Sequence, residues 1–277
     1  MAKVTQLIHN YLRHTKKFPH VFCPGCGHGI VLGSLIRSVH EQSLSKDDIV
    51  LVAGIGCSGR IPVYVDFNTV HTTHGRALTF ATGIKLANPG LKVIVIMGDG
   101  DALSIGGNHL IHAARRNIGL TTLVLNNHIY GMTGGQSSST TPFGCYSTTT
   151  PFGQMENEFD IAEVTKACGA NFVGRATVMQ ANLMDRLIST ALESPGFSLV
   201  EVITPCHTQF GRKNKYKSTV DMYKWLKKNS RPIEKYKEMS PQKQKDIIPT
   251  GIFVQKDCAG LEQKYIQMRQ RIRGGAK

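Results

Sequence analysis

Apolar residues occur along this chain in short continuous runs that are separated by stretches of mixed polarity. Five runs rich in Val, Ile and Leu are predicted to be strands, and they cover residues 49–56, 92–100, 121–127, 171–176 and 198–204. Continuous apolar runs are typical of parallel strands covered on both faces, whereas alternation would indicate a sheet with one face in water. The pattern therefore predicts a buried, mostly parallel sheet.

Stretches with helical periodicity lie before and between these runs. They cover residues 27–42, 75–88, 102–119, 160–170 and 179–196. Several of them end at glycine or proline residues, which stop helices. Alternation of strands and helices is typical of a doubly wound α/β fold with helices on both faces of the sheet. Ligands of such folds bind at the carboxyl ends of the strands, and we expect the functional site there.

Two later regions depart from this alternation. Residues 128–158 are rich in Gly, Ser and Thr, and a loop of this length is usually functional. After Cys206 the pattern weakens into a basic and mostly helical tail. We therefore divide the chain into a main domain, residues 1–210, and a C-terminal extension, residues 211–277.

The composition narrows the class of protein. Hydrophobic residues make up 41% of the 277 residues, which is enough for a core and argues against disorder. The chain has no run of 18 apolar residues, and its N-terminus lacks the apolar region and cleavage site of a secretory signal. We therefore expect a cytoplasmic protein that does not span a membrane.

The charge is strongly positive and unevenly distributed. The formal net charge is +14, and much of it lies in residues 212–245. A basic surface of this kind can attract nucleic acid, an anionic membrane, an acidic protein or an anionic substrate, or it can be a solvated tail. Because no zinc-finger, RNP or helix-turn-helix signature accompanies the charge, we expect no nucleic-acid partner.

Two polar motifs follow neighbouring predicted strands. Gly98-Asp99-Gly100 ends one strand, and Asn126-Asn127 ends the next. The glycines allow the backbone to approach a diphosphate, and the helix that follows points its N-terminus at the anion. An Asp and an Asn at neighbouring strand ends can also share one Mg²⁺, which prefers oxygen ligands. The alternative is a plain β-turn with capping residues, while the nucleotide-binding signatures GxGxxG and Walker A are absent.

Four of the seven cysteines are placed where they could form one site. Cys23 and Cys26 form a Cys-x-x-Cys pair, Cys57 follows the first predicted strand, and Cys206 follows the last. Four thiols can bind either zinc or an iron–sulfur cluster, and the spacing alone does not choose, although zinc normally uses two paired knuckles. The remaining cysteines have no partner motif, and the one in a predicted helix is expected to be a buried small hydrophobe. They are Cys145, Cys168 and Cys258, of which Cys168 lies in that helix.

Five segments carry a resemblance to a known family. CPGCGHG, GIGCSGR, HTTHGRALTFATGIKLANP, GDGDALSIGGNHLIHAARRNIG and NNHIYGMTGGQSSSTTP resemble, in this order, the β subunit of 2-oxoacid:ferredoxin oxidoreductases. The similarity covers roughly residues 20–210. It implies that residues 1–210 form the diphosphate-binding half of a thiamine-diphosphate-binding fold, together with an iron–sulfur site.

The resemblance also implies roles for individual residues. Mg²⁺ would be bound by Asp99, Asn127 and the backbone carbonyl of Ile129, and a [4Fe–4S] cluster by Cys23, Cys26, Cys57 and Cys206. By the same analogy, the catalytic residues would be His74, Arg76 and Thr133, and Gln136 would lie near the substrate. The residues implied to contact the cofactor are Gly56, Cys57, Ser58, His74, Gly75, Gly98, Asp99, Gly100, Asp101, Asn127, Ile129, Gly131 and Thr133.

The reaction implied by the resemblance is oxidative decarboxylation of a 2-oxoacid. CoA receives the acyl group, CO₂ is released, and electrons pass through the [4Fe–4S] cluster to ferredoxin. The catalytic Glu and the pyrimidine-binding half of the fold lie on an α subunit in this family. We therefore expect the chain to be active only with that partner, as a heterodimer or an (αβ)₂ assembly. The rival interpretations are a thiamine decarboxylase or synthase without redox chemistry, and a zinc-bound binding module.

The choice of 2-oxoacid is less constrained. The stretch HIYGMTGGQ resembles members that act on 2-oxoglutarate or branched-chain 2-oxoacids more than those acting on pyruvate, and some broad-specificity relatives carry Lys where Gly134 stands. We favour 2-oxoglutarate, whose distal carboxylate needs a cation. The candidates are His128, Arg60 and His28, unless the α subunit supplies the cation. The alternatives are that Arg60 pairs at the surface and that His128 caps a strand end.

Basic residues follow Cys206 closely and suggest a contact for the electron acceptor. They are Arg212, Lys213, Lys215 and Lys217. Because charge complementarity steers association between proteins, we hypothesise that these residues help to dock an acidic ferredoxin.

Overall fold

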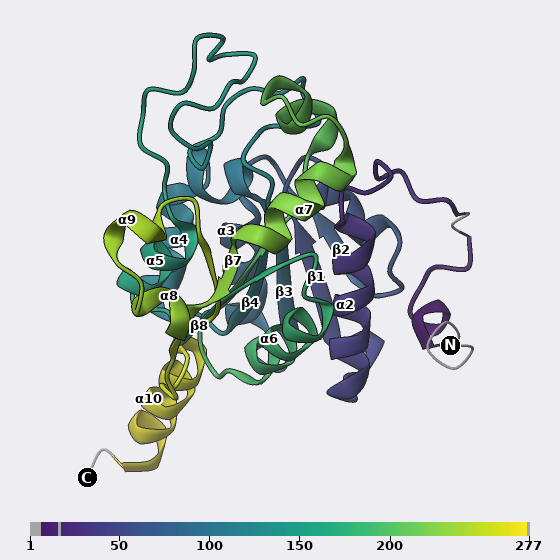
Figure 1. Cartoon of the computed structure of the whole chain (residues 1–277). Coiled ribbons are helices and arrows are strands. Elements are labelled where there is room, and N and C mark those ends of the chain that lie inside the picture. Colours follow the sequence, from purple (N-terminus) through teal and green to yellow (C-terminus); the bar gives the residue numbers. More distant parts are fainter. Residues whose placement is uncertain (1–6, 16–17, 276–277) are drawn as a thin grey trace.

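The apolar runs of the sequence form the centre of one eight-stranded sheet in the computed structural model, which describes residues 7–15 and 18–275 (Figure 1). The strands follow the order β2-β1-β3-β4-β6-β5-β8-β7 across the sheet. Neighbours from β2 to β5 are parallel, β8 pairs antiparallel with β5, and β7 pairs parallel with β8. The strands are β1 (Ile49–Ala53), β2 (Asn68–His71), β3 (Lys92–Gly98), β4 (Leu120–Asn126), β5 (Phe172–Thr177), β6 (Ser198–Ile203), β7 (Ser230–Pro232) and β8 (Ile248–Gln255).

Helices cover both faces of this sheet. On one face α2 and α6 pack in a buried cluster with Leu51, Ile94 and Val200, and on the other face α3, α4 and α5 pack with Val50 and Val95. Successive strand residues therefore point into opposite layers, which explains why the strands are apolar without alternation. The helices are α2 (His28–Glu41), α3 (Ala77–Ala87), α4 (Gly107–Arg116), α5 (Ile161–Ala167) and α6 (Ala181–Glu193).

This architecture confirms the predicted fold class. The five predicted strands correspond to β1, β3, β4, β5 and β6, and they form a parallel sheet with helices on both faces. The sequence pattern misses β2, β7 and β8. The first two are short and partly exposed, so they carry no apolar run. The division of the chain at residue 211 stays a prediction. β8 lies in the predicted extension, yet it pairs with β5 of the main sheet.

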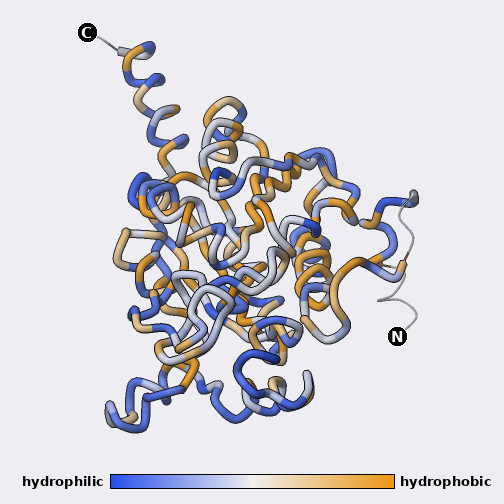
Figure 2. Tube along the Cα trace, turned by 90° about the horizontal axis from the view of Figure 1, so that it is seen from above, coloured by the Kyte–Doolittle hydropathy of each residue, from blue (hydrophilic) through white to orange (hydrophobic). Residues whose placement is uncertain are grey.

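The chain after β6 adds β8 and β7 to the sheet and ends in a projecting helix. Figures 1 and 2 both show α10 leaving the body of the molecule. Within the described residues, no helix combines the length and hydropathy that crossing a membrane requires. These helices are α7 (Thr219–Asn229), α8 (Ile233–Lys237), α9 (Pro241–Gln244) and α10 (Leu261–Gly275). Short segments of 3₁₀ or π helix are η1 (Lys46–Asp48), η2 (Ser58–Val63), η3 (Gly100–Ser104) and η4 (His207–Gly211).

The long loop predicted at residues 128–158 is confirmed. All of its residues are described, and they contain no helix or strand, only one bridge that pairs Tyr130 with Gln136. Figure 1 shows this teal segment rising above the sheet. The loop begins directly after β4 and therefore starts at the carboxyl edge of the sheet, where the site is expected.

Candidate active site at the carboxyl ends of the strands

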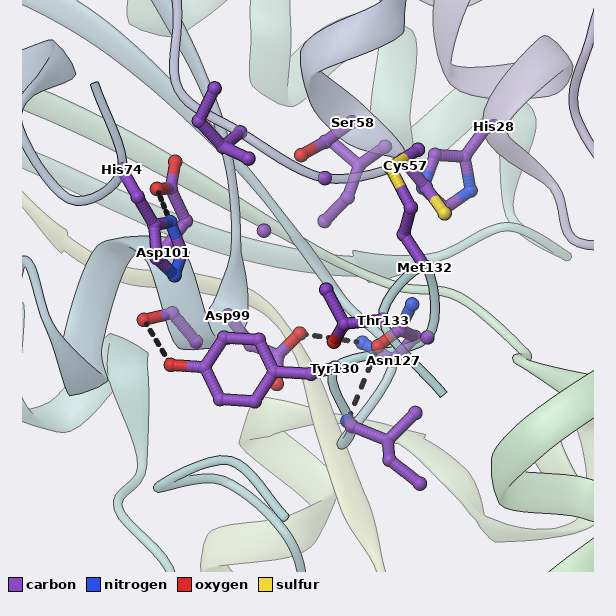
Figure 3. Close-up of a pocket in the computed structure, with 17 residues that line it drawn as sticks. His28, Cys57, Ser58, His74, Asp99, Asp101, Asn127, Tyr130, Met132 and Thr133 are labelled. Atoms are coloured by element: carbon purple, nitrogen blue, oxygen red, sulfur yellow. Dashed lines mark hydrogen bonds and ion pairs between the residues drawn. The ribbon is translucent and has the colours of Figure 1, made fainter. Parts of the chain in front are cut away.

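Segments that leave the carboxyl ends of β1, β3 and β4 surround one pocket (Figure 3). This is the edge of a parallel α/β sheet at which ligands bind. The pocket brings together most of the residues that the sequence suggests for a cofactor, although their roles stay predictions. They are Gly56, Cys57, Ser58, His74, Gly98, Asp99, Gly100, Asp101, Asn127, Ile129, Gly131 and Thr133.

Asp99 is held from one side by two hydroxyl groups of the long loop. Its carboxylate is 2% exposed, and its Oδ2 accepts hydrogen bonds from Ser138 Oγ at 2.6 Å and Thr140 Oγ1 at 2.7 Å. Its Oδ1 has only a long contact of 3.4 Å with the backbone N–H of Asn127. One carboxylate oxygen is therefore occupied by the protein, and the other is weakly engaged.

The two asparagines after β4 have different surroundings. Asn126 donates to Glu201 Oε1 at 2.8 Å and accepts from the backbone N–H of His128 at 3.0 Å, so it is tied to the protein interior. Asn127 lines the pocket, and its Oδ1 accepts from the backbone N–H of Ile129 at 3.2 Å. His128 has φ +62°, and the bond from its N–H to Asn126 Oδ1, two residues back, is that of an Asx turn. Asn126 therefore fixes the turn, and Asn127 is the one that faces the pocket.

His74 and Asp101 form a pair at the pocket wall, visible on the left of Figure 3. Nδ1 of His74 lies 2.5 Å from Asp101 Oδ1, which also accepts from the backbone N–H of Gly75 at 2.7 Å. Burial raises the pKa of Asp101, while the N–H groups of Gly75 and His74 oppose this rise. A Cβ on Gly54 would lie 1.6 Å from Asp101 Oδ2, so this pair requires glycine at the end of β1.

Four thiols gather beside the same pocket. Cys23 is exposed, Cys26 and Cys57 are half-buried, and Cys206 is buried. Cys57 lines the pocket directly. A Cβ on Gly131 would lie 3.1 Å from Cys206 Sγ and 3.8 Å from the Asn127 amide nitrogen. The thiol group and the Asp99–Asn127 side of the pocket are therefore close neighbours.

The thiols influence one another electrostatically. Burial, together with the neighbouring Cys206, Cys26 and Cys23, raises the pKa of Cys57 to about 11. Burial also raises the pKa of Cys26, with further contributions from Cys23 and Cys206. Buried thiols of this kind are easily deprotonated only when a cation binds them. Within residues 7–15 and 18–275, no three His, Cys, Asp or Glu side chains are arranged around a single metal ion.

Three further candidates from the sequence lie outside the pocket wall. Arg76 stands at the start of α3, where its guanidinium lies 3.4 Å from the carbonyls of Gly75 and Ile105. Gln136 is paired with Thr133, whose hydroxyl donates to Gln136 Oε1 at 2.6 Å. Gly75 adopts φ +72° and acts through its N–H to Asp101. Gln136 thus restrains Thr133 rather than lining the pocket itself.

The three candidates for binding a distal carboxylate differ in their suitability. His28 lines the pocket, but burial lowers its pKa to about 4, so it is neutral near pH 7. His128 is held by the backbone carbonyl of Thr140, 2.9 Å from its Nδ1. Arg60 is exposed and does not line the pocket. Of the three, Arg60 alone carries a permanent charge.

The remaining cysteines do not line the pocket. Cys145 is half-buried and packs against the cluster that contains Ile129 and Cys206, and Cys258 is exposed. Cys168 ends α5 and packs against the core, although it is only partly buried. The prediction of a buried small hydrophobe at Cys168 is therefore met only in part: the side chain packs on the core but stays partly exposed.

Comparison with known proteins gives the family. The model of a family described as thiamine pyrophosphate enzyme, C-terminal TPP binding domain, matches residues 54–202. The 2-oxoglutarate synthase subunit KorB of Methanothermobacter thermautotrophicus is 46% identical over 268 residues, which are 96% of this chain and 94% of that protein. The 2-oxoacid:ferredoxin oxidoreductase subunit beta of Saccharolobus solfataricus is 37% identical, over 90% of this chain and 86% of that protein. This chain belongs to the β subunits of the 2-oxoacid:ferredoxin oxidoreductases.

A solved structure agrees with this family. The 2-oxoglutarate:ferredoxin oxidoreductase of Magnetococcus marinus, with 2-oxoglutarate, coenzyme A and succinyl-CoA bound, matches with a TM-score of 0.85 and 31% identity. The match covers 97% of this chain and 91% of that chain. The resemblance inferred from sequence is therefore confirmed, and the β subunit carries a thiamine-diphosphate-binding domain. A thiamine enzyme without redox chemistry and a zinc-bound module no longer account for the chain.

Sequence reasoning missed several residues of this β subunit. Ser138 and Thr140, which hold Asp99, lie in a Ser- and Thr-rich run whose composition indicates hydroxyl donors but not their target. Tyr130 lines the pocket and donates to the carbonyl of Gly100 at 3.1 Å. Ile55 and Met132 also line it, and at 42% and 48% exposure they carry no polar signal that would mark them.

Proposed function

We propose that this β subunit, together with an α subunit, converts 2-oxoglutarate and CoA into succinyl-CoA and CO₂ and passes two electrons to ferredoxin. The observation that best supports this function is that one pocket borders both the Asp99–Asn127 pair and the four thiols. The substrate is favoured because relatives named 2-oxoglutarate synthase are 46% and 48% identical over 96% of this chain. Bound thiamine diphosphate would supply the electron sink for decarboxylation.

The pocket fits a polar ligand such as the diphosphate of this cofactor. Ser58 Oγ is buried in its wall without a hydrogen-bond partner among the described residues. Buried polar groups are normally paired, so this hydroxyl is a candidate donor to the diphosphate. Gly98 and Gly100 flank Asp99, and a Cβ on Gly98 would lie 3.5 Å from Ser58 Oγ, so this hydroxyl lies beside the strand end. These features support thiamine diphosphate in the pocket.

A Mg²⁺ ion fits next to the diphosphate. Asp99 Oδ1, the amide oxygen of Asn127 and the carbonyl of Ile129 are the candidate ligands, and all three residues line the pocket. Hard oxygen donors of this kind suit Mg²⁺, which also keeps water and phosphate ligands. The protein's own contribution is to hold the Asp99 carboxylate in one orientation through Ser138 and Thr140.

The two hydroxyls that hold Asp99 give a testable consequence. In the Ser138→Ala/Thr140→Val variant Asp99 loses both donors to Oδ2, and we expect the apparent Mg²⁺ affinity to fall roughly ten- to a hundred-fold, as is usual when groups that orient a metal ligand are removed. Mg²⁺ titration of thiamine diphosphate binding to the αβ complex measures it. Ser139→Ala is the matched control, because Ser139 bonds Ser104 and not Asp99. Equal Mg²⁺ affinity in both variants would contradict the orienting role.

The four thiols fit an iron–sulfur cluster. The ligands of a cluster bind several iron atoms, so they do not need to meet at one ion. Cys23, Cys26, Cys57 and Cys206 come from three separate segments, and Cys57 and Cys206 both lie against the pocket. We assign a [4Fe–4S] cluster to these residues, and its iron charge would favour the thiolate form of each.

We propose that the α subunit covers the mouth of the pocket. The apolar side chains of Ile55 and Met132 line the pocket and remain 42% and 48% exposed. Ile105, next to the pocket residues of η3, is 47% exposed. Large apolar groups clustered at the rim of a site are typical of a surface that a partner covers. The α subunit would supply the pyrimidine-binding half and the catalytic Glu, in a heterodimer or an (αβ)₂ assembly.

One experiment tests the proposed function directly. The β subunit is purified anaerobically with its α subunit, and we expect thiamine diphosphate, about four irons per αβ unit and broad absorbance near ~400 nm. CoA-dependent viologen reduction is then compared across 2-oxoglutarate, pyruvate and branched-chain 2-oxoacids, and 2-oxoglutarate should give the highest kcat/KM. Stoichiometric zinc, or a preference for pyruvate, would contradict the proposal.

A further inference from the structure

The four thiols are reached from solvent on one side. Cys206 is buried and Cys57 faces the pocket, whereas the consecutive residues Cys23, Pro24 and Gly25 are all exposed. Electron transfer between proteins requires the two redox groups to come close together. A carrier that approaches without opening the active site therefore has access on the side of residues 23–25.

The N-terminal turn of α7 lies against this exposed loop. Gly25 has φ +82°, and a Cβ on it would lie 2.6 Å from Thr219 Cγ2. Figure 1 shows α7 beside the end of α2 that follows Cys26. The contact places the segment between Cys206 and α7 next to the thiols. This segment contains the basic residues suggested by the sequence.

The basic residues here are exposed and unpaired. Arg212, Lys215 and Lys217 are exposed, and among the described residues their side chains take part in no ion pair or hydrogen bond. Lys213 differs, because it is half-buried and its Cε would lie 2.8 Å from a Cβ on Gly135. Residues 212–245 contain twelve Lys and Arg but three Asp and Glu. The free cations therefore dominate the potential around the loop.

Two exposed apolar side chains lie next to the thiol loop and the N-terminal turn of α7. Val21 is 71% exposed and precedes Cys23 by two residues, and Val220 is 61% exposed and follows Thr219. A small apolar centre with a charged rim suits a transient protein contact, in which the charges set the approach and the apolar centre excludes water. Nucleic acid would use the charge but not this centre.

We infer that residues 21–25, the N-terminal turn of α7 and the rim of Arg212, Lys215 and Lys217 form the docking face for a small acidic iron–sulfur carrier of the ferredoxin class. This inference rests on the proposed function, which makes the four thiols the electron exit. It also narrows the basic set suggested by the sequence, since Lys213 packs on the protein instead of facing the carrier. The face lies outside the pocket, so a carrier can dock while substrate is bound.

The test reverses the rim charges in the complete αβ complex. The variant is Arg212→Glu/Lys215→Glu/Lys217→Glu, and the matched control is Lys264→Glu/Arg269→Glu/Arg271→Glu on the projecting helix α10, where the same number of exposed charges is reversed. A small acidic two-cluster ferredoxin is the probe. We measure its Kd for the oxidised complex by calorimetry at low and high salt, and then kcat/KM for its reduction.

We expect the rim variant to bind the ferredoxin roughly ten- to a hundred-fold more weakly at low salt, with the difference shrinking as salt rises. The same loss should appear in kcat/KM for ferredoxin, while reduction of methyl viologen, which needs no docking face, stays unchanged. An unchanged viologen rate also shows that the variant is folded and loaded. The α10 control should bind like the wild type.

Three outcomes would overturn the inference. One is unaltered ferredoxin affinity in the rim variant, and another is an equal loss in the α10 control, which would reflect net charge alone. The third is intact ferredoxin binding combined with lost binding to DNA or to anionic lipid vesicles, which would assign the rim to a polyanion. A wild-type complex that reduces neither viologen nor ferredoxin would instead contradict the proposed function, and the calorimetric Kd would still decide the docking face.

Discussion

The Asp99→Asn substitution is expected to remove metal-dependent binding of thiamine diphosphate from the αβ complex. The carboxylate is the only anionic group among the three candidate ligands of Mg²⁺, and the hydroxyls of Ser138 and Thr140 already engage its Oδ2. An amide at this position loses the negative charge and one acceptor oxygen. Because even groups that only orient a metal ligand are worth roughly ten- to a hundred-fold in affinity or activity, we expect kcat/KM to fall at least about a hundred-fold.

The measurement has two parts. Thiamine diphosphate retained after gel filtration in Mg²⁺ reports cofactor binding, and CoA-dependent viologen reduction reports turnover. Asp66→Asn is the matched control, since Asp66 undergoes the same chemical change in an exposed ion pair with Lys46. Full cofactor content in the Asp99→Asn complex would show that Asp99 does not hold the cation. Iron content should be unchanged in both variants, because neither Asp99 nor Asp66 is a proposed ligand of the cluster.

The central strands could be predicted because their environment is uniform. Residues of β3 and β4 are buried on both faces by two helical layers, and this leaves continuous apolar runs in the sequence. β2 escapes detection because it is a four-residue edge strand with half-exposed or exposed side chains. β8 escapes because its sheet partner β5 lies more than seventy residues earlier, and nothing local marks that pairing.

The candidate site could be predicted only where the functional residues directly follow a strand. Asp99 and Asn127 follow β3 and β4 directly, so parallel topology alone brings them together. Ser138 and Thr140 reach Asp99 across 39 and 41 residues, through a loop without periodicity. The path of such a loop depends on contacts made in the folded state, and these contacts have no sequence pattern. The pairing of His74 with Asp101 across 27 residues was hidden for the same reason.

One glycine joins the two halves of the site. Gly131 lies between Cys206 Sγ and the Asn127 amide, and a side chain there would contact both. The loop after β4 therefore separates the proposed metal from the buried thiol by the thickness of its backbone alone. Glycine in this place keeps the distance between the pocket and the thiols short. The same loop then turns back to hold Asp99, so residues 128–140 serve both sides of the site.

A buried ionic network connects β5 and β6 next to Asn126. Arg175 is 5% exposed and bonds Glu201 Oε2 at 2.7 Å and Asp160 Oδ1 at 2.5 Å. Burial alone would lower the pKa of Arg175, but the two carboxylates more than offset it and raise the pKa above its ordinary value. Glu201 also accepts from Asn126, the residue that fixes the turn to Asn127. The network thus links β5 and β6 to the start of the long loop.

Removal of the cation from this network should be strongly destabilising. In the Arg175→Met variant, Glu201, which is 1% exposed, would keep a buried charge without its cation, and breaking a buried pair in this way costs about 3–5 kcal/mol. For a chain of this size the loss corresponds to a fall in Tm of roughly 10 °C. Thermal unfolding of the αβ complex measures it. The Arg37→Met control breaks the partly exposed pair with Asp185 and should cost no more than about 1 kcal/mol.

A second variant separates the unpaired charge from the lost packing. Arg175→Met/Glu201→Gln removes both charges of the buried pair, and its amide oxygen can still accept from Asn126. Since replacing a buried ion pair by neutral groups of similar size is often nearly neutral, we expect most of the lost Tm to return. The turn at Asn127 should return with it, and the Mg²⁺ affinity should follow the Tm. If the double variant is as unstable as Arg175→Met alone, packing of the guanidinium against Phe253 is the main contribution, and the network does not position the site through its charge.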